Sequence, residues 1–119
     1  MALVLITDDA AFTRRMIRKA FKDTDHVILE ATNGKECLEM VDTHSPDCLL
    51  LDLLMPELDG FGVLETLKQQ GSKIPVIVLS ADIQDSVREQ CLNLGAVKML
   101  KKPPKGPQIL EAIEQALNS

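Results

Sequence analysis

Three short aliphatic runs without polar alternation stand out along the chain, at residues 2–6, 48–51 and 74–79. Strands that are apolar on both faces are typical of a parallel sheet covered by helices on each side. Two weaker apolar segments, 26–31 and 97–101, are each followed by a turn signal, Asn33-Gly34 and Pro103-Pro104. The pattern therefore predicts five strands.

Between these segments, apolar residues recur at helical spacing, which predicts the inner faces of helices. The stripes consist of Phe12, Met16, Ile17, Ala20 and Phe21; Phe61, Leu64 and Leu67; Val87, Cys91 and Leu94; and Ile109, Leu110, Ile113, Ala116 and Leu117. The predicted helix boundaries are N-caps at Asp9, Asn33 and Asp59, a terminator at Gly95 and a first-turn proline at Pro107.

The order of elements is βαβαβαβαβα, in which a helix connects each strand to the next. Right-handed crossovers then place helices on both faces of one sheet. We expect an α/β, doubly wound, five-stranded parallel sheet with five helices. With 119 residues and no linker or repeat, residues 1–119 are expected to form a single domain.

Composition excludes several classes of protein. The hydrophobic fraction is 45% and the charged fraction 26%, which is ordinary for a globular domain, and no apolar run approaches the roughly 20 residues of a membrane span. The first residues lack the basic region of a signal peptide, so a cytoplasmic location is expected. A net charge of −5 disfavours direct binding to nucleic acid or to an anionic membrane.

The three cysteines, Cys37, Cys48 and Cys91, are odd in number and widely spaced. This favours reduced core thiols over a disulfide framework or a zinc site. The methionine and phenylalanine side chains are assigned to the core, and His26 and His44 to ordinary surface or turn positions.

The residues with candidate chemistry follow the carboxyl ends of the predicted strands, which is where doubly wound sheets bind ligands. These residues are Asp8, Asp9, Asp52, Ser80, Lys101 and Lys102. If the first and third strands are neighbours, about 5 Å apart, the three carboxylates repel one another and need a cation. Oxygen ligands with positions left open for water and phosphate favour Mg²⁺. A carboxylate beside Mg²⁺, with a lysine and a hydroxyl nearby, predicts a phosphoryl-acceptor site.

Each residue also has a simpler interpretation on its own. Asp8-Asp9 would serve as a helix cap, Asp52 as a turn residue, Ser80 as a helix-initiating hydroxyl and Lys102 as part of a solvated basic run. Their joint placement at four strand ends favours the site.

Several motifs resemble the receiver domain of two-component response regulators, most closely the stand-alone chemotaxis type. The resemblance spans Leu3 to about Leu117. Its parts are Asp8-Asp9 followed by Arg14-Arg15, the segments 30–34 and 52–60, Leu79-Ser80-Ala81, Gly95-Ala96 and Lys102-Pro103. The string D-x-x-M-P-x-x-D-G in residues 52–60 is the most specific part. The resemblance also implies the flavodoxin-like strand order 2-1-3-4-5.

By resemblance, Asp52 is the phosphorylated aspartate, Asp9 a direct Mg²⁺ ligand and Asp8 the acid that holds a metal-bound water. The backbone carbonyl of Leu54 completes the protein ligands. Ser80 is the hydroxyl that moves to the phosphoryl group. Lys102 is the lysine that pairs with it, chosen over Lys101 because it directly precedes the proline, and the Lys102–Pro103 bond is expected to be cis.

The chain departs from the family at two positions. Met99 stands where the family often has an aromatic switch residue, so a ring movement is not assumed. Leu54, two residues after the phosphoacceptor, stands where a polar residue is frequent, and Asp82 faces the same approach of water. Leu54 and Asp82 therefore bear on how fast the phosphoryl group is lost.

The resemblance implies a Mg²⁺-dependent phosphorylation switch. The donor is a phosphohistidine on a sensor histidine kinase or phosphotransfer protein, and the readout is a changed affinity for a downstream target or output domain. The domain is not an enzyme in the usual sense, because it catalyses only its own phosphorylation and slow dephosphorylation. One alternative is a haloacid-dehalogenase-like phosphatase, which needs a second acid where Leu54 stands. Another is a receiver fold that is never phosphorylated, against which the five site residues argue.

Overall fold

The computed structural model describes residues 1–118; Ser119, the last residue of the expected domain 1–119, lies outside the described residues. Five strands and five helices alternate along residues 1–118. The strands are β1 (Leu3–Thr7), β2 (Val27–Ala31), β3 (Cys48–Asp52), β4 (Val76–Ser80) and β5 (Lys98–Lys101). The helices are α1 (Ala11–Lys19), α2 (Gly34–His44), α3 (Gly60–Gln69), α4 (Asp85–Asn93) and α5 (Gly106–Leu117).

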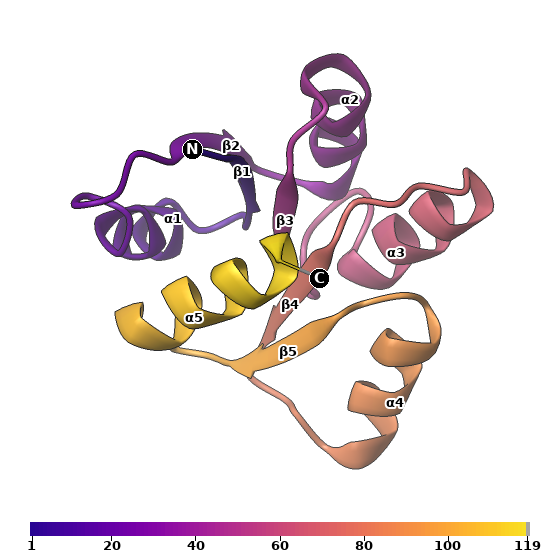
Figure 1. Ribbon diagram of the computed structural model, residues 1–119. Helices are drawn as coiled ribbons and strands as arrows, with labels where there is room; N and C mark the ends of the chain where they lie inside the picture. Colours follow the sequence, from indigo (N-terminus) through magenta and orange to yellow (C-terminus); the bar gives the residue numbers. More distant parts are fainter. Residues whose placement is uncertain (119) are drawn as a thin grey trace.

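All neighbouring strands are parallel, and their order is β2-β1-β3-β4-β5. Helices α1 and α5 cover one face of the sheet, and α2, α3 and α4 cover the other (Figure 1). The expected fold class, strand order and alternation are therefore confirmed.

The sheet separates two hydrophobic clusters because successive side chains of a strand point to opposite faces. In β3, Leu49 and Leu51 pack toward α2, α3 and α4, while Cys48 and Leu50 pack toward α1 and α5. Every residue of β3 is buried. β3 is thus covered on both faces. Asp52 is its last residue, so this polar side chain lies at the end of a buried strand.

Side chains cap two helices where the sequence predicts it. Asn33 Oδ1 accepts the backbone N–H of Glu36 at 2.8 Å, and Asp59 Oδ1 accepts that of Gly62 at 2.9 Å. These bonds satisfy N–H groups that a helix start leaves without partners. The predicted terminator is also confirmed, since Gly95 follows α4 with a φ of +104°.

The loop between β3 and α3 packs against two glycines that begin helices. A Cβ at Gly34 would overlap the carbonyl oxygen of Leu58, which accepts the Gly34 N–H at 3.1 Å. A Cβ at Gly60 would lie 2.6 Å from the carbonyl oxygen of Asp52. Only glycine permits approaches this close, so these two positions fix the course of the loop that follows Asp52.

Three assignments to core or surface are wrong. Phe12 and Met1 are exposed rather than buried. Phe12 lies in the first turn of α1 and is 71% exposed, whereas Ile17 of the same helix is fully buried. His26 is largely buried, packs edge-on against Phe21 and accepts the Ala2 N–H at 3.1 Å, whereas His44 is exposed as expected.

The cysteines are buried free thiols, as predicted. Burial raises the pKa of Cys37 to about 11 and that of Cys48 to about 12. Both thiols are therefore protonated at neutral pH and are poor nucleophiles.

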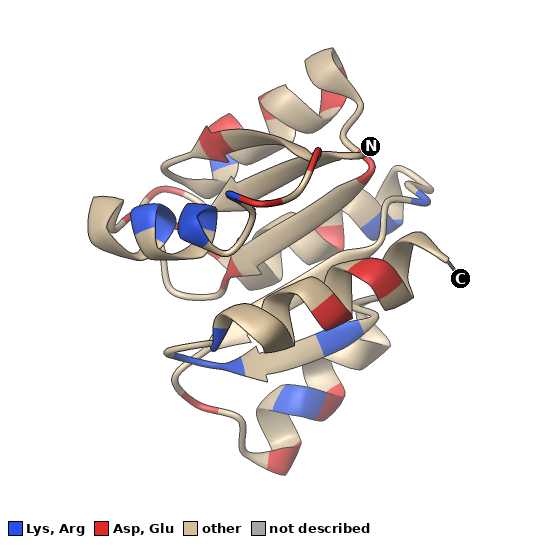
Figure 2. Ribbon diagram, turned by 60° about the vertical axis from the view of Figure 1, so that its left-hand side comes forward, with Lys and Arg blue, Asp and Glu red and all other residues tan. Residues whose placement is uncertain are grey.

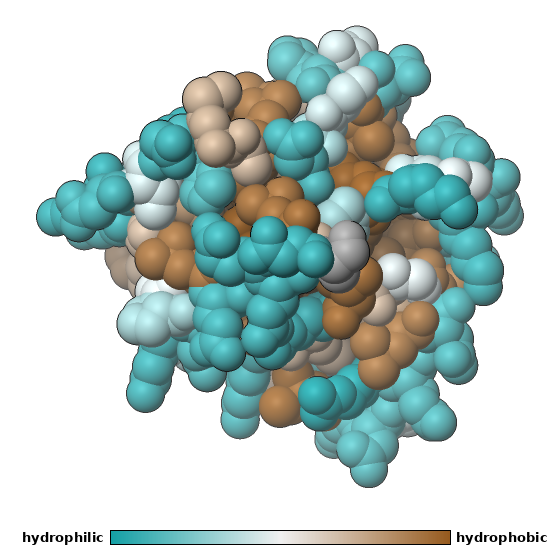
Figure 3. Space-filling model, viewed as in Figure 1, coloured by the Kyte–Doolittle hydropathy of each residue, from teal (hydrophilic) through white to brown (hydrophobic). Residues whose placement is uncertain are grey.

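None of the helices in residues 1–118 is long and apolar enough to cross a membrane. Hydrophilic residues form much of the outline in the view of Figure 3, and hydrophobic residues show between them. Acidic and basic residues are interspersed along the ribbon, and neither sign of charge covers a whole side in the view of Figure 2.

Candidate phosphoryl-acceptor site

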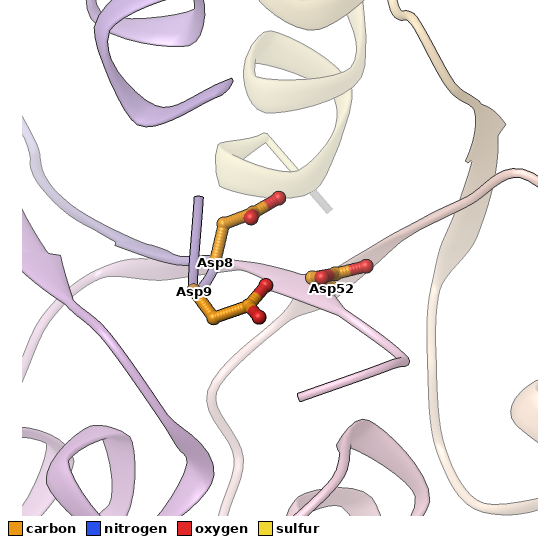
Figure 4. Close-up of side chains that lie close together, drawn as sticks. All are labelled: Asp8, Asp9 and Asp52. Carbon is orange, nitrogen blue, oxygen red and sulfur yellow. The ribbon is translucent and has the colours of Figure 1, made fainter. Parts of the chain in front are cut away.

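Asp8 and Asp9 follow directly after β1. The Asp8 side chain is buried, and its Oδ1 accepts the backbone N–H of Ala10 at 2.9 Å. The prediction that Asp9 is the N-cap of α1 is wrong, because Ala10 occupies that position and Asp9 is exposed. The acid that accepts a hydrogen bond near the helix start is Asp8, because its side chain reaches forward over the turn to the Ala10 N–H. The Asp9 carboxylate is thereby left to face Asp52 (Figure 4).

Asp52 ends β3, the strand next to β1. Thr7 lies opposite Leu51 in the parallel register, so the residues that follow each of them, Asp8 and Asp52, emerge side by side. One carboxylate oxygen from each of Asp8, Asp9 and Asp52 lies within 4.8 Å of the other two (Figure 4). The sheet thus brings three carboxylates into one cluster, and Asp52 is only 5% exposed.

The Lys102 ammonium partly neutralises this cluster. Lys102 Nζ lies 2.7 Å from Asp8 Oδ2 and 3.0 Å from Asp52 Oδ1. Lys102 follows β5, its backbone N–H bonds the Ser80 carbonyl at 2.9 Å, and the Lys102–Pro103 bond is cis as expected. Lys101, by contrast, is exposed. One positive charge among three acids leaves the cluster with an excess of negative charge.

The pKa values of Asp52 and Lys102 are both raised in this cluster, which carries excess negative charge. Burial, assisted by the Asp8 charge, raises the pKa of Asp52 above its usual value despite the hydrogen bond from Lys102. Burial alone would lower the pKa of Lys102, but its bonds with Asp8 and Asp52 outweigh burial and raise it. Lys102 therefore stays charged at neutral pH, and the Asp52 carboxylate is destabilised by its surroundings.

Ser80 ends β4, one residue beyond Leu79, which lies opposite Asp52. Its hydroxyl donates to the Asp82 carbonyl at 2.8 Å and accepts the Asp82 N–H at 3.1 Å. Both bonds stay within the loop after β4. Breaking them frees the hydroxyl to turn toward another acceptor at this edge.

The residues expected to tune the site differ in their surroundings. Leu54 is 77% exposed on the loop after Asp52. Asp82 is exposed, and its Oδ1 accepts the Gln84 N–H at 3.0 Å. Met99 is buried in the cluster beneath α2, α3 and α4, beside Val78 of β4.

The donor set suits a hard divalent cation. All three side chains offer carboxylate oxygen, and the group contains no thiolate or imidazole. Mg²⁺ prefers such ligands and is commonly held by one or two carboxylates plus water and phosphate. The excess negative charge gives a second reason for the fit, because a divalent ion would relieve the repulsion.

The sequence interpretation assigned no contact to Arg14 or Glu30, although both belong to the quoted motifs. Arg14 Nη1 donates to the Asp8 carbonyl at 2.6 Å, and Arg14 Nε donates to Glu30 Oε1 at 2.8 Å. A signal was present in the spacing: Arg14 and Arg18 are four residues apart on one helix face and share the acid Glu30.

Comparison with known proteins decides the family. A model of the response regulator receiver domain matches residues 4–114. The chain belongs to this family. The receiver domain is 39% identical over 116 residues to the chemotaxis protein CheY of Bacillus subtilis, covering 97% of each chain. It is also 39% identical over 104 residues to the protein-glutamate methylesterase/protein-glutamine glutaminase of Treponema denticola, covering 84% of this chain and 28% of that protein.

Solved structures agree with this assignment. The receiver domain of the Francisella response regulator 1452 superimposes with a TM-score of 0.94 at 28% identity, covering 99% of this chain and 98% of that one. The response regulator domain of Thermotoga maritima CheB gives 0.88 at 28% identity, with 98% and 96% covered. The protein is therefore a CheY-like receiver domain of two-component signalling.

Proposed function

We propose that this receiver domain accepts a phosphoryl group on Asp52 from the phosphohistidine of a sensor histidine kinase or phosphotransfer protein. The observation that carries the proposal is the arrangement around Asp52. A buried carboxylate lies within reach of two more acids and 3.0 Å from the Lys102 ammonium, at the carboxyl-end edge of the sheet.

Asp9, Asp52 and the backbone carbonyl of Leu54 would hold Mg²⁺ directly, and Asp8 would hold it through a water. When bound, the ion supplies positive charge to the phosphoryl oxygens. Lys102, 3.0 Å from Asp52 Oδ1, would supply a second positive charge to the phosphoryl oxygens. Its bridge to Asp8 also keeps the ammonium near Asp52 before the donor arrives.

An oxygen of Asp52 attacks phosphorus while the N–P bond of the donor breaks. The electron pair of that bond stays on the imidazole nitrogen, and a carboxyl O–P bond forms. Asp52 is a suitable nucleophile because its raised pKa marks a carboxylate that its surroundings stabilise poorly. Hydrolysis of the same O–P bond restores Asp52 and releases phosphate.

The signal leaves the site through Ser80. A phosphoryl oxygen on Asp52 offers the Ser80 hydroxyl a stronger, charged acceptor than the Asp82 carbonyl. Turning toward it breaks the two bonds with Asp82 and moves the loop between β4 and α4. The face from β4 to α5 then changes its affinity for a downstream target protein or output domain.

The test is phosphorylation of the whole chain by a small phosphodonor such as acetyl phosphate, with and without Mg²⁺. We expect mass spectrometry to find a Mg²⁺-dependent acyl phosphate in the wild type and none in Asp52→Ala. Asp42→Ala is the matched control, because Asp42 is an exposed aspartate of α2. Wild-type phosphorylation of the Asp52→Ala protein would refute the assignment.

A further inference from the structure

The guanidinium of Arg14 connects the turn that carries Asp8 and Asp9 to the end of β2. The Arg14 side chain is only 14% exposed. Its Nη1 donates to the Asp8 carbonyl at 2.6 Å, and its Nε donates to Glu30 Oε1 at 2.8 Å. The carbonyl that Arg14 binds belongs to the peptide unit between Asp8 and Asp9, so this contact acts on the backbone of the acidic pair.

Glu30 is itself held in place. Arg18 Nε donates to Glu30 Oε2 at 3.0 Å, so each carboxylate oxygen has an arginine partner. Burial alone would raise the pKa of Glu30, but the bonds and charges of Arg18 and Arg14 outweigh burial and lower it. Glu30 therefore stays ionised at neutral pH and forms a strong, charge-assisted hydrogen bond with the planar Arg14 guanidinium.

The Asp8–Asp9 turn is fixed from three directions. The Asp8 N–H bonds the Ala31 carbonyl at 3.2 Å, Asp8 Oδ1 accepts the Ala10 N–H, and the Asp8 carbonyl accepts Arg14. The carbonyl bond orients the peptide plane that precedes Asp9. That plane sets the direction of the exposed Asp9 side chain toward Asp52.

We infer that Arg14, held by Glu30, is a positioning residue for divalent-cation binding, because it orients the Asp8–Asp9 peptide so that the Asp9 carboxylate faces Asp52. The inference rests on the proposed Mg²⁺ site and adds two residues that touch neither the ion nor the phosphoryl group.

If Arg14 acts only through its charge, its removal should change the Mg²⁺ affinity in one direction, and if it positions the ligands, in the opposite direction. Arg14 is a cation close to an acidic cluster, and the charge alone opposes the approach of Mg²⁺. Removing that charge should strengthen Mg²⁺ binding if Arg14 acts only through its charge. Removal should weaken binding if Arg14 orients the ligands. The direction of the change therefore separates the two roles.

Arg18 provides a matched control. It bonds the same acid from the same helix face, but its side chain is 51% exposed and its second contact is the Ile28 carbonyl, at 3.4 Å, rather than Asp8. Arg18→Met and Arg14→Met each remove one positive charge and one bond to Glu30. Only Arg14→Met removes the bond to the Asp8 carbonyl.

The experiment is calorimetric measurement of Mg²⁺ binding to the full chain without a phosphodonor, at constant ionic strength. We expect Arg14→Met to weaken binding by about tenfold, the low end for residues that orient metal ligands. Arg18→Met should bind as tightly as the wild type or more tightly. Arg14→Lys, which keeps the charge and the chain length but loses the planar fork, should fall between wild type and Arg14→Met.

Two outcomes overturn the inference in different ways. Wild-type or tighter Mg²⁺ affinity in a folded Arg14→Met protein shows that Arg14 does not position the site, and the proposed function survives. If Arg14→Met does not fold, wild-type affinity in Arg14→Lys has the same meaning. If the wild type itself does not bind Mg²⁺, both the inference and the proposed cofactor fail.

Discussion

Leu54 is the residue at the rim of the site whose chemistry most directly concerns the lifetime of the phosphorylated state. It is 77% exposed, two residues after Asp52, and has no group that could orient an attacking water. We expect slow self-dephosphorylation, and Leu54→Asn should accelerate it. The acceleration is roughly tenfold if the new contact is worth about 1.4 kcal/mol in the transition state. The decay of phosphorylated protein after removal of the donor measures it.

The control is Leu92→Asn, the same change at an exposed leucine of α4. It should leave the decay unchanged. An unchanged or slower decay in Leu54→Asn would show that access of water is set elsewhere, with Asp82 as the next residue to change.

Asp52 should make folding stability depend on pH in a characteristic direction. Its folded-state pKa lies above the ordinary value of 3.8, so the ionised carboxylate costs stability at neutral pH. Without Mg²⁺, Asp52→Asn should therefore unfold at a higher temperature than the wild type at pH 7. The difference should shrink as pH falls through the folded-state pKa of Asp52, where the wild-type residue becomes protonated.

Thermal unfolding of both proteins from pH 7 to pH 4 measures this difference. The other carboxylates are the same in both proteins, so their effects on the unfolding temperature largely cancel. A less stable Asp52→Asn protein at pH 7 would mean that the Lys102 ion pair outweighs burial and the repulsion from Asp8.

Among the elements, α2 is linked to the phosphoacceptor loop through Gly34. A Cβ there would overlap the Leu58 carbonyl, so Gly34→Ala should push α2 and the loop apart. We expect a loss of about 1 to 3 kcal/mol in the free energy of unfolding, as for other overpacked sites. Denaturant unfolding measures it.

Gly106→Ala is the matched control, because Gly106 also begins a helix but a Cβ there would lie 3.7 Å from the Ala20 Cβ, an ordinary contact. It should be neutral or slightly stabilising. Equal losses in the two variants would show that the close approach to Leu58 is not the cause.

Local sequence patterns predicted the elements well and their tertiary contacts less well. The strands, the caps Asn33 and Asp59 and the terminator Gly95 depend on neighbouring residues alone, so periodicity and capping rules sufficed. The acidic cluster was predictable because parallel strands end at one edge. The Arg14–Glu30 contact depends on how α1 is rotated against β2, and the burial of His26 depends on Phe21 and the start of β1. The spacing of Arg14 and Arg18 places both on one face of α1, but it does not identify Glu30 as the acid they share, and nothing in the local pattern indicates that His26 is buried.

At the scale of the whole molecule, the acidic cluster should couple Mg²⁺ to folding. An ion that binds only the folded state adds about 1.4 kcal/mol of stability at ten times its dissociation constant. We expect Mg²⁺ to raise the unfolding temperature of the wild type and a chelator to reverse the rise. Asp9→Ala should lose most of the effect. An equal rise in Asp9→Ala would place the ion elsewhere on the molecule.

The contact between Lys102 and Asp8 joins residues 94 positions apart, with Asp52 between them. The site exists only when β1, β3 and β5 have all been placed in one sheet. Acyl phosphate formation would thus serve as a reporter of completed folding: in a refolding experiment, the ability to be labelled should appear with the last strand to dock and not with early helix formation. A fragment that ends before β5 would lack labelling even if its remaining helices and strands were intact.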